Sequence, residues 1–376
     1  MHRKLGFLTG NRIIILIVNV LLLCAFAICL SLSKSIKNTL RSQQAASAWA
    51  GQSGERFTQI SAFLPNGAAF TENSIIGFHS AVDSALLEVS LEAKDGSPLY
   101  IDAWSALGEV SVVGERGSAR VQVFGVGGDF FFFHPLYIRD GCYLSPDDLM
   151  KDRVVLDEEL AWRLFGSVSL AGLTVTINNK PYFIAGVVSR EDDFASTKAY
   201  ASGAGMFMSY EALSEITGNN AEIICYEIVM PDPITGFAIG AFSDMFTYTE
   251  AIVENSVRYT FSNTLETIAS YGKRSMRNEG IVFPYWENAA RYSEDWIALL
   301  LVLSFLFAIY PAISGIIFFT KLTKFALRGG MRIVRKKIDQ RDDRKAEQYR
   351  LAHIEETLIP SIEEIIREVQ EEREKA

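Results

Sequence analysis

The chain has 376 residues, which suits one large domain with appendages better than one ordinary domain. Hydrophobic residues make up 49% of it, close to the average for globular proteins, so any strong apolar excess must be local. The net charge is −9, and residues 34–295 carry 33 Asp or Glu against 19 Lys or Arg. This acidic balance argues against nucleic-acid binding.

Two uncharged apolar runs, residues 13–32 and 296–320, each reach the ~20 residues that a helix needs to cross a bilayer core. Backbone polar groups must be paired inside lipid, so we predict transmembrane helices at residues 13–33 and 296–320. The basic residues before the first run are also typical of a cleaved signal peptide. The run exceeds the usual 7–15 residues, however, and no A-x-A site follows it at the right distance, which favours an uncleaved anchor.

Lysine and arginine beside the second run predict the orientation of the chain. Seven basic residues and no acidic ones lie between residues 321 and 337, whereas acidic residues dominate just before residue 296. The positive side of a membrane helix is normally cytoplasmic. We therefore expect residues 1–12 and 321–376 to be cytoplasmic and residues 34–295 to be extracytoplasmic, in a multi-pass protein of the cytoplasmic membrane.

The extracytoplasmic region mixes strand and helix patterns in chain order and predicts an α+β domain. Asp157 is a predicted N-cap with acids in the first turn that follows it, and Asn178-Asn179 is a predicted tight hairpin turn. Strands are predicted at 58–64, 86–91, 110–113, 120–126, 153–156, 173–177, 182–188 and 223–229, and helices at 74–82, after Ser145, at 158–165, at 210–217 and over most of 237–295.

The tail, residues 339–376, is dense in charge but carries one apolar stripe at helical spacing. Its members are Leu351, Ile354, Leu358, Ile362, Ile365 and Val369. Ser361 opens a capping box, so Pro360 is predicted to separate two helices. The stripe could form a coiled coil with a second copy, dock on another protein, or pack on its own chain.

Cysteine use is sparse. Cys24 and Cys29 fall in the first apolar run and are predicted to be packing residues. Cys142 and Cys225 both lie in the extracytoplasmic region and could form one disulfide, with two buried thiols as the alternative.

Four consecutive phenylalanines, Phe130, Phe131, Phe132 and Phe133, would fill both faces of a strand. They predict a strand buried on both sides or at a contact of the ectodomain, with a ligand or partner surface as the sharper alternative.

No catalytic motif accompanies the histidines of this region, His79 and His134, and we expect structural roles for both. The acidic loop at residues 191–193 lacks EF-hand spacing and is expected to be solvated rather than a calcium site. We predict no enzyme activity, no cofactor and no metal.

An ordered string of short motifs lies between residues 59 and 190. Its members are residues 123–126, 128–131, 154–161, 164–166, 172–177, 180–182 and 185–188. This string resembles the periplasmic core domain of MacB-type permeases, the ABC transporter family that includes macrolide exporters and lipoprotein-releasing permeases. Gly141 sits where the family has a Gly-Arg pair, with Cys142 in place of the arginine.

Two departures qualify what the resemblance implies. Permeases of this family carry three membrane helices after the core domain, and one is predicted here; the chain also has no phosphate-binding loop for ATP. The expected function is a non-catalytic component, or an orphan relative, of an ABC-type export system. It would contact membrane lipid, a separate ABC ATPase or multi-span permease subunit, and a second copy in a homodimer. The alternatives are a membrane sensor or scaffold and, more remotely, an ectodomain hydrolase.

Overall fold

A computed structural model describes residues 10–91, 98–200, 205–218, 220–271, 277–278 and 280–375. The chain divides into two compact units. The globular unit is Phe26–Phe305, and the helical unit joins the N-terminal end of the chain, through Ala25, with the residues from Leu306 onward.

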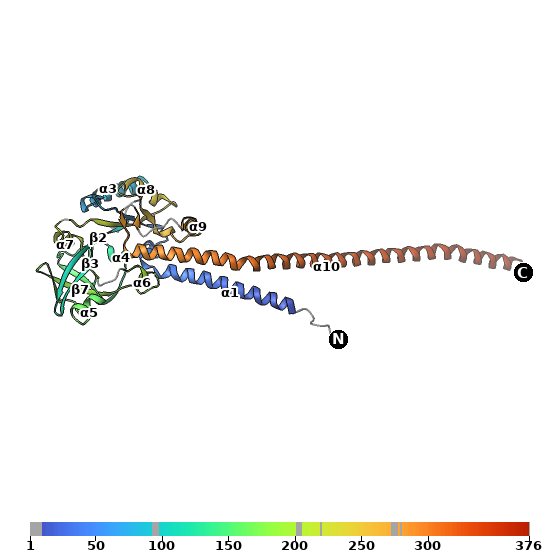
Figure 1. The fold of residues 1–376 in the computed structure, drawn as a ribbon. Helices are drawn as coiled ribbons and strands as arrows, with labels where there is room; N and C mark the ends of the chain where they lie inside the picture. Colours follow the sequence, from blue (N-terminus) through green and yellow to red (C-terminus); the bar gives the residue numbers. More distant parts are fainter. Residues whose placement is uncertain are drawn as a thin grey trace. The chain divides into compact units, whose positions relative to one another are not determined.

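Ten helices are described, and the last is by far the longest (Figure 1). They are α1 (Gly10–Thr39), α2 (Ala45–Ala50), α3 (Glu72–Glu88), α4 (Phe130–Phe133), α5 (Glu158–Leu164), α6 (Ser196–Ala199), α7 (Tyr210–Ile216), α8 (Phe237–Met245), α9 (Phe261–Ser270) and α10 (Tyr285–Glu374), with short 3₁₀ turns η1 (Arg41–Gln43) and η2 (Asn255–Val257).

The strands form one mixed sheet of ten and one small two-stranded sheet, β11–β12. The order in the large sheet is β10-β1-β9-β2-β3-β8-β5-β7-β4, with β6 pairing β2 and β7. Their bounds are β1 (Phe57–Phe63), β2 (Ile101–Gly114), β3 (Gly117–Gly128), β4 (Tyr137–Gly141), β5 (Arg153–Asp157), β6 (Thr174–Ile177), β7 (Lys180–Ser189), β8 (Gly205–Ser209), β9 (Ile223–Pro231), β10 (Ile252–Glu254), β11 (Arg277–Asn278) and β12 (Ile281–Val282).

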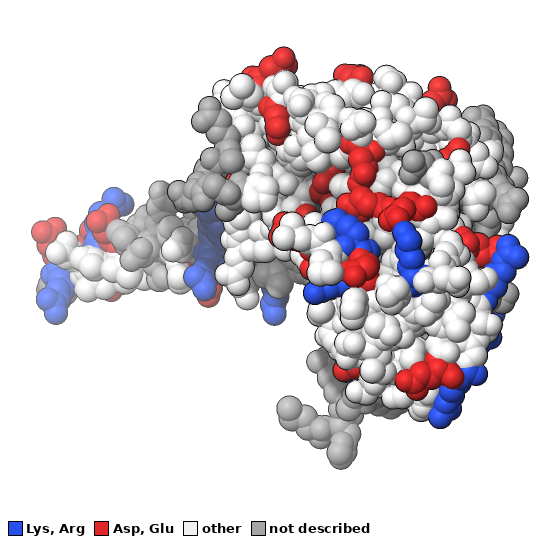
Figure 2. Space-filling model, turned by 90° about the vertical axis from the view of Figure 1, so that its left-hand side faces the viewer, with Lys and Arg blue, Asp and Glu red and all other residues white. Residues whose placement is uncertain are grey.

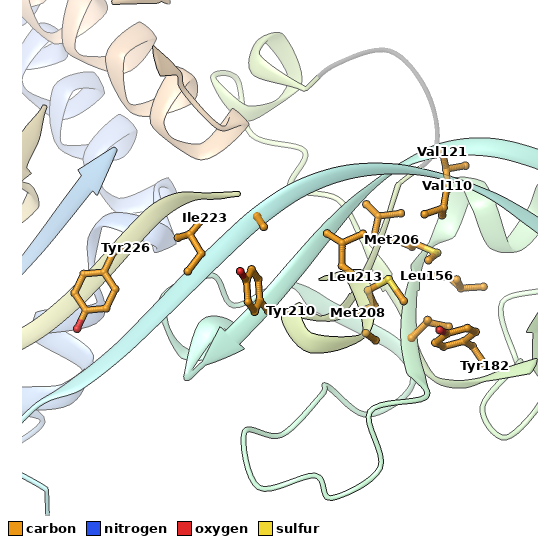
Figure 3. Packing of buried hydrophobic residues seen from close by; sticks show 14 of the residues in the cluster. Val110, Val121, Leu156, Tyr182, Met206, Met208, Tyr210, Leu213, Ile223 and Tyr226 are labelled. Atoms are coloured by element: carbon orange, nitrogen blue, oxygen red, sulfur yellow. The ribbon is translucent and has the colours of Figure 1, made fainter. Parts of the chain in front are cut away.

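Buried apolar clusters cover both faces of the large sheet. Successive side chains of its central strands point alternately into one cluster and the other. On β9, Tyr226 and Ile228 point into one hydrophobic cluster, and Cys225 and Val229 point into the other. Helices α3, α5, α7 and α8 contribute to the first cluster, part of which is seen in Figure 3. Helices α2, α4 and the first turn of α10 contribute to the second. The start of α10 is therefore part of the globular core.

Two predictions that rested on local turn chemistry are confirmed. The Asn178-Asn179 turn joins β6 to β7, and both residues have positive φ (49° and 63°), as a type I′ hairpin turn requires. Asp157 caps α5 by accepting a hydrogen bond from the Leu160 backbone N–H at 2.7 Å.

Other local predictions were wrong. Residues 86–88 continue α3 instead of starting a strand, because a short apolar run has no period that separates the two structures. Ser145 begins a turn with no helix after it. The tail is not broken at Pro360, since α10 continues to Glu374.

Two described helices are long and apolar enough to cross a membrane, one within Ile13–Thr39 and one within Tyr285–His353. Large apolar side chains such as Leu21, Ile316 and Phe318 are exposed along them. Water would make such surfaces unfavourable, whereas lipid would not.

Candidate functional site

Charged residues at the base of α10 and just after η2 form a hydrogen-bonded group in the globular unit. Arg258, just after η2, donates through Nη1 and Nη2 to the two carboxylate oxygens of Glu287, each at 2.7 Å. Its Nε donates to Glu294, one to two turns further along α10. Arg291 donates to Glu287 from the same helix, at 2.7 Å. We call Arg258, Glu287, Arg291 and Glu294 the junction cluster.

Two members of the junction cluster, Arg258 and Glu287, are buried. The side chain of Arg258 is 4% exposed and that of Glu287 is 1% exposed. Burial alone would raise the pKa of Glu287, but Arg258 and Arg291 hold that pKa below its ordinary value. Burial alone would lower the pKa of Arg258, and the two glutamates raise it instead. Both groups are charged at neutral pH, and each depends on the other.

A chain of hydrogen bonds continues from the junction cluster into the sheet. Arg258 donates to Gln43 on η1 at 3.2 Å and to Asn255 at 3.3 Å. Asn255 donates to the Ser61 hydroxyl on β1 at 2.6 Å. The guanidinium of Arg258 thus links three parts of the globular unit: the segment after α1, the edge of the sheet and α10.

This chain of hydrogen bonds ends at a second buried pair, which Glu227 of β9 forms with His134. Ser61 donates to Glu227 at 2.7 Å, and Nε2 of His134 bonds the other carboxylate oxygen of Glu227. The His134 ring packs on Trp286 of α10, with ring centroids 4.3 Å apart. His134 therefore sits in a structural contact between the sheet and α10, and no nucleophile is hydrogen-bonded to it among the described residues.

The four phenylalanines form the helical turn α4, so the predicted strand was wrong. The backbone N–H of Phe132 bonds the Asp129 carbonyl at 2.8 Å, which closes the turn. Three rings are buried in the cluster around α10, and Phe132 is 37% exposed and packs edge-on against Trp49. A helical turn lets three of the four rings pack in one cluster on one face of the sheet. A strand would instead point successive rings to opposite faces.

Cys142 and Cys225 are not joined. Cys142 follows β4 and is exposed, whereas Cys225 is buried on β9, and both are free thiols. Burial raises the pKa of the Cys225 thiol well above its ordinary value, so it remains protonated.

The apolar stripe of the tail lies on one long stretch of α10. The exposed members of the stripe, each with about half or more of its surface accessible, are Leu351, Ile362, Ile365 and Val369. Ile354 and Leu358 fall outside the residues whose side chains the structure describes. The stripe is a candidate partner surface.

The acidic loop is occupied by local contacts. Asp193 accepts hydrogen bonds from the backbone N–H groups of Ala195 and Ser196, at 2.9 and 3.1 Å, in the turn that leads into α6. The Tyr200 hydroxyl donates to Glu191 at 3.2 Å. Among the described residues, no group of three or more His, Cys, Asp or Glu could hold a metal ion.

On the face of the molecule seen in Figure 2, acidic side chains gather with basic ones beside them. Lys151 bonds Glu211 at 3.2 Å and Arg153 bonds Asp148 at 3.3 Å. Such exposed pairs contribute little stability.

The side chain of His79 on α3 contacts Asp102 on β2, and this contact should make the stability of the fold depend on pH. Its Nε2 lies 2.6 Å from Asp102, which also accepts from the Tyr226 hydroxyl at 2.7 Å. The hydrogen bond to Asp102 raises the pKa of His79 above its usual 6.5, although burial opposes this. The protonated ring therefore stabilises the fold fully below pH ~6.5 and loses that contribution as the pH rises through the folded-state pKa.

We expect the wild-type chain to exceed a His79→Leu variant in unfolding free energy by about 1 kcal/mol at pH 6. The gap should narrow as the pH rises. Denaturant titrations at pH 6, 7.5 and 9 measure it, and a gap that grows with pH contradicts the assignment.

Sequence reasoning missed the junction cluster. Glu287 and Arg291 are spaced i, i+4 on an otherwise apolar helix start, which was the only available signal. Nothing in the sequence pointed to Arg258, because its partner lies 29 residues away.

Comparison with known proteins agrees with the fold. The family described as MacB-like periplasmic core domain matches residues 14–232. The Macrolide export ATP-binding/permease protein MacB of Aggregatibacter actinomycetemcomitans is 32% identical over 82 residues, 21% of this chain, and the match spans only 13% of that protein.

Two solved structures are similar at low identity. The extracellular domain of the noncanonic ABC-type transporter YknZ from Gram-positive bacteria is 17% identical, with 53% of this chain and 99% of that one covered and a TM-score of 0.35. The periplasmic region of MacB from Actinobacillus actinomycetemcomitans is 18% identical, with 56% and 92% covered and a TM-score of 0.35. With more than half of its length matched by the family, this chain belongs to the proteins that carry a MacB-like periplasmic core domain.

Proposed function

We propose that this chain is a non-catalytic membrane component, or an orphan relative, of an ABC-type export or lipoprotein-release system. In this role it couples an extracytoplasmic domain, residues 34–295, to the cytoplasmic side of the membrane. Its partners would be a separate ABC ATPase or a multi-span permease, and a second copy of itself. The observation that carries the proposal is the junction cluster, which fixes the start of α10 in the globular core.

The coupling follows from the continuity of α10. The helix begins beside the sheet at Tyr285, includes the apolar run 296–320, and ends in the charged tail at Glu374. A displacement of the globular core acts on α10 through Arg258 and Glu287, because a buried bidentate pair resists separation. A partner that binds residues 321–376 would then sense the state of the ectodomain.

The proposed topology has both ends of the chain in the cytoplasm. Within the helical unit, the Asn19 side chain donates to the Ser314 hydroxyl at 3.0 Å. Asn19 and Ser314 each lie six residues inside the cytoplasmic end proposed for their run, so the two polar groups meet at the same depth. Polar side chains in lipid favour such interhelical bonds. The seven basic residues at 321–337 would face anionic lipid headgroups.

Affinity capture of the full chain from its native membrane in mild detergent tests the transporter role. We expect an ABC ATPase or a multi-span permease to co-purify at near-stoichiometric level. Recovery of the chain with only itself, or with unrelated cytoplasmic proteins, would exclude that role. The family membership would then reflect shared fold and ancestry alone.

The exposed thiol of Cys142 gives a direct test of topology. In intact cells, a membrane-impermeant maleimide should label the wild-type chain, because Cys142 is exposed and Cys225 is buried. Cys142→Ser should remove the label and Cys225→Ser should not. In cells with an outer membrane, that membrane is first permeabilised. Labelling that appears only after the inner membrane is broken would place the domain in the cytoplasm.

A membrane sensor or scaffold is the second candidate, and the exposed tail residues Leu351, Ile362, Ile365 and Val369 favour it. In that role the ectodomain binds a ligand and the tail docks a cytoplasmic protein. Deleting residues 339–376 discriminates between the two roles. If transporter subunits still co-purify with the shortened chain, the tail is not the coupling arm.

A further inference from the structure

Helix α9 presents its large apolar side chains away from the globular unit. Phe261 and Leu265 lie one turn apart, so they share one side of the helix, and they are 56% and 44% exposed. The side that packs on the globular unit is polar, because Thr264 is only 6% exposed and Asn263 donates to the Val257 carbonyl at 3.1 Å. A helix of a protein in water normally has the opposite arrangement, with its apolar side toward the core. The outward side of α9 is therefore suited to apolar surroundings.

This outward side is continuous with the exposed surface of the second apolar run. The Phe261 ring contacts the Phe305 ring of α10, with centroids 6.2 Å apart, and more than half of each residue is exposed. Leu299 and Val302, earlier on the same run, are exposed as well. In Figure 1, α9 lies at the end of the globular unit from which α10 leaves. The medium that surrounds Phe305 therefore also reaches Phe261.

The length of the second run sets the depth of Phe305 in a bilayer. About 20 residues cross the hydrocarbon core, and counting about 20 residues back from Lys321 reaches residue 301. The part of the run before this position is largely withdrawn from lipid, because Ile297, Ala298 and Leu300 are buried in the globular unit. At 1.5 Å per residue, Phe305 lies about 6 Å inside the core boundary. Phe261, beside it, is then level with the extracytoplasmic leaflet.

A second group of rings agrees with this depth. Phe194 is exposed, and its ring centroid lies 5.4 Å from that of Trp296 and 5.2 Å from that of Tyr292. Trp296 is about 7.5 Å outside residue 301 along the helix. Tryptophan and tyrosine are enriched at this level of a bilayer, where hydrocarbon meets the headgroups.

We propose that α9 is a membrane-surface helix whose Phe261 and Leu265 insert into the extracytoplasmic leaflet beside α10. The inference rests on the proposed topology, in which residues 296–320 cross the membrane. The occupant is the apolar part of the lipid and not an anionic headgroup, because Glu266 is the only charged residue of α9. The extracytoplasmic domain would then contact the bilayer directly, in addition to being held by its two spans.

Spin labels on the full chain in phosphatidylcholine vesicles test this insertion. Cys24→Ser and Cys142→Ser remove the exposed thiols, and the buried Cys29 and Cys225 are retained. In this background Leu265→Cys is labelled with a nitroxide. Oxygen concentrates in lipid, whereas a nickel chelate stays in water. We expect oxygen to relax the Leu265→Cys label more strongly than the chelate does.

Three matched sites set the scale of this measurement. Glu266→Cys, on the polar side of α9, and Leu87→Cys, exposed on α3, should respond to the nickel chelate several-fold more than Leu265→Cys does. Ile316→Cys, exposed on the second apolar run, should respond mainly to oxygen. Because α9 has no basic residue, added salt should not change the result at Leu265→Cys. A circular dichroism spectrum equal to that of wild type qualifies each variant.

A Leu265→Cys label that responds like the Leu87→Cys label overturns the proposal, because water then covers α9. A label shielded from both reagents also overturns it, since a second copy or another protein then covers that side of the helix. If the Ile316→Cys label itself favours the nickel chelate, the proposed topology fails and the insertion of α9 fails with it. The vesicles contain no transporter subunit, so each of these results is distinct from a failure of the affinity capture.

Discussion

Replacing Arg258 with methionine is expected to lower the unfolding free energy of the chain by about 3–5 kcal/mol. The substitution removes both hydrogen bonds to Glu287 and the bond to Glu294. Glu287 would keep Arg291 as a partner but would remain buried with two of its three described hydrogen bonds missing. Removing one member of a buried ion pair is far more destabilising than removing the whole pair.

A double variant tests that reasoning. Arg258→Met combined with Glu287→Met leaves Arg291 and Glu294, which are opposite in charge, and should recover a large part of the loss. Arg163→Met breaks an exposed pair with Glu159 and should change stability by less than about 1 kcal/mol. Denaturant unfolding of the full chain in mild detergent, followed by circular dichroism, provides the values. If Arg258→Met matches the exposed control, the junction cluster does not hold α10.

The β6–β7 hairpin and the cap of α5 could be predicted because their signals are local. Asn178 and Asn179 adopt the positive φ angles of their turn whatever the distant sequence is, and Asp157 caps the residues next to it. The resemblance to the family rests on these same segments. Local chemistry and family membership therefore agree over the part of the chain that the family covers, residues 14–232.

The junction cluster could not be predicted, because its chemistry depends on long-range packing. Arg258 and Glu287 read as ordinary surface charges until the fold buries them together. All four members of the cluster also lie beyond residue 232, where the family match ends.

The four phenylalanines were misread for a related reason. A run of identical rings has neither period 2 nor period 3.6, so its secondary structure is decided by what it packs against. Here Trp286 supplies the surface, with Phe130 at 5.7 Å and His134 at 4.3 Å between ring centroids. The turn α4 and the start of α10 determine each other.

Trp286 carries the second large effect. Trp286→Ala is expected to lower the unfolding free energy by about 3–5 kcal/mol, because it empties the centre of the cluster between the sheet and α10. The side chain is 2% exposed and meets the rings of Phe124, Phe130, His134 and Tyr285. Trp286→Phe keeps an aromatic ring in place and should lose clearly less. Circular dichroism during denaturant unfolding measures both without relying on tryptophan emission.

The combination of the two sites is the stronger test of how α10 is held. Trp286 and Arg258 both act on the first turns of the helix, one through apolar packing and one through charge. If they fix the same cooperative contact, the loss in Trp286→Ala with Arg258→Met should depart from the sum of the single losses by about 0.5–3 kcal/mol. Additive losses would mean that the apolar and ionic contacts hold α10 independently, and that a signal from the sheet could reach the helix through either one alone.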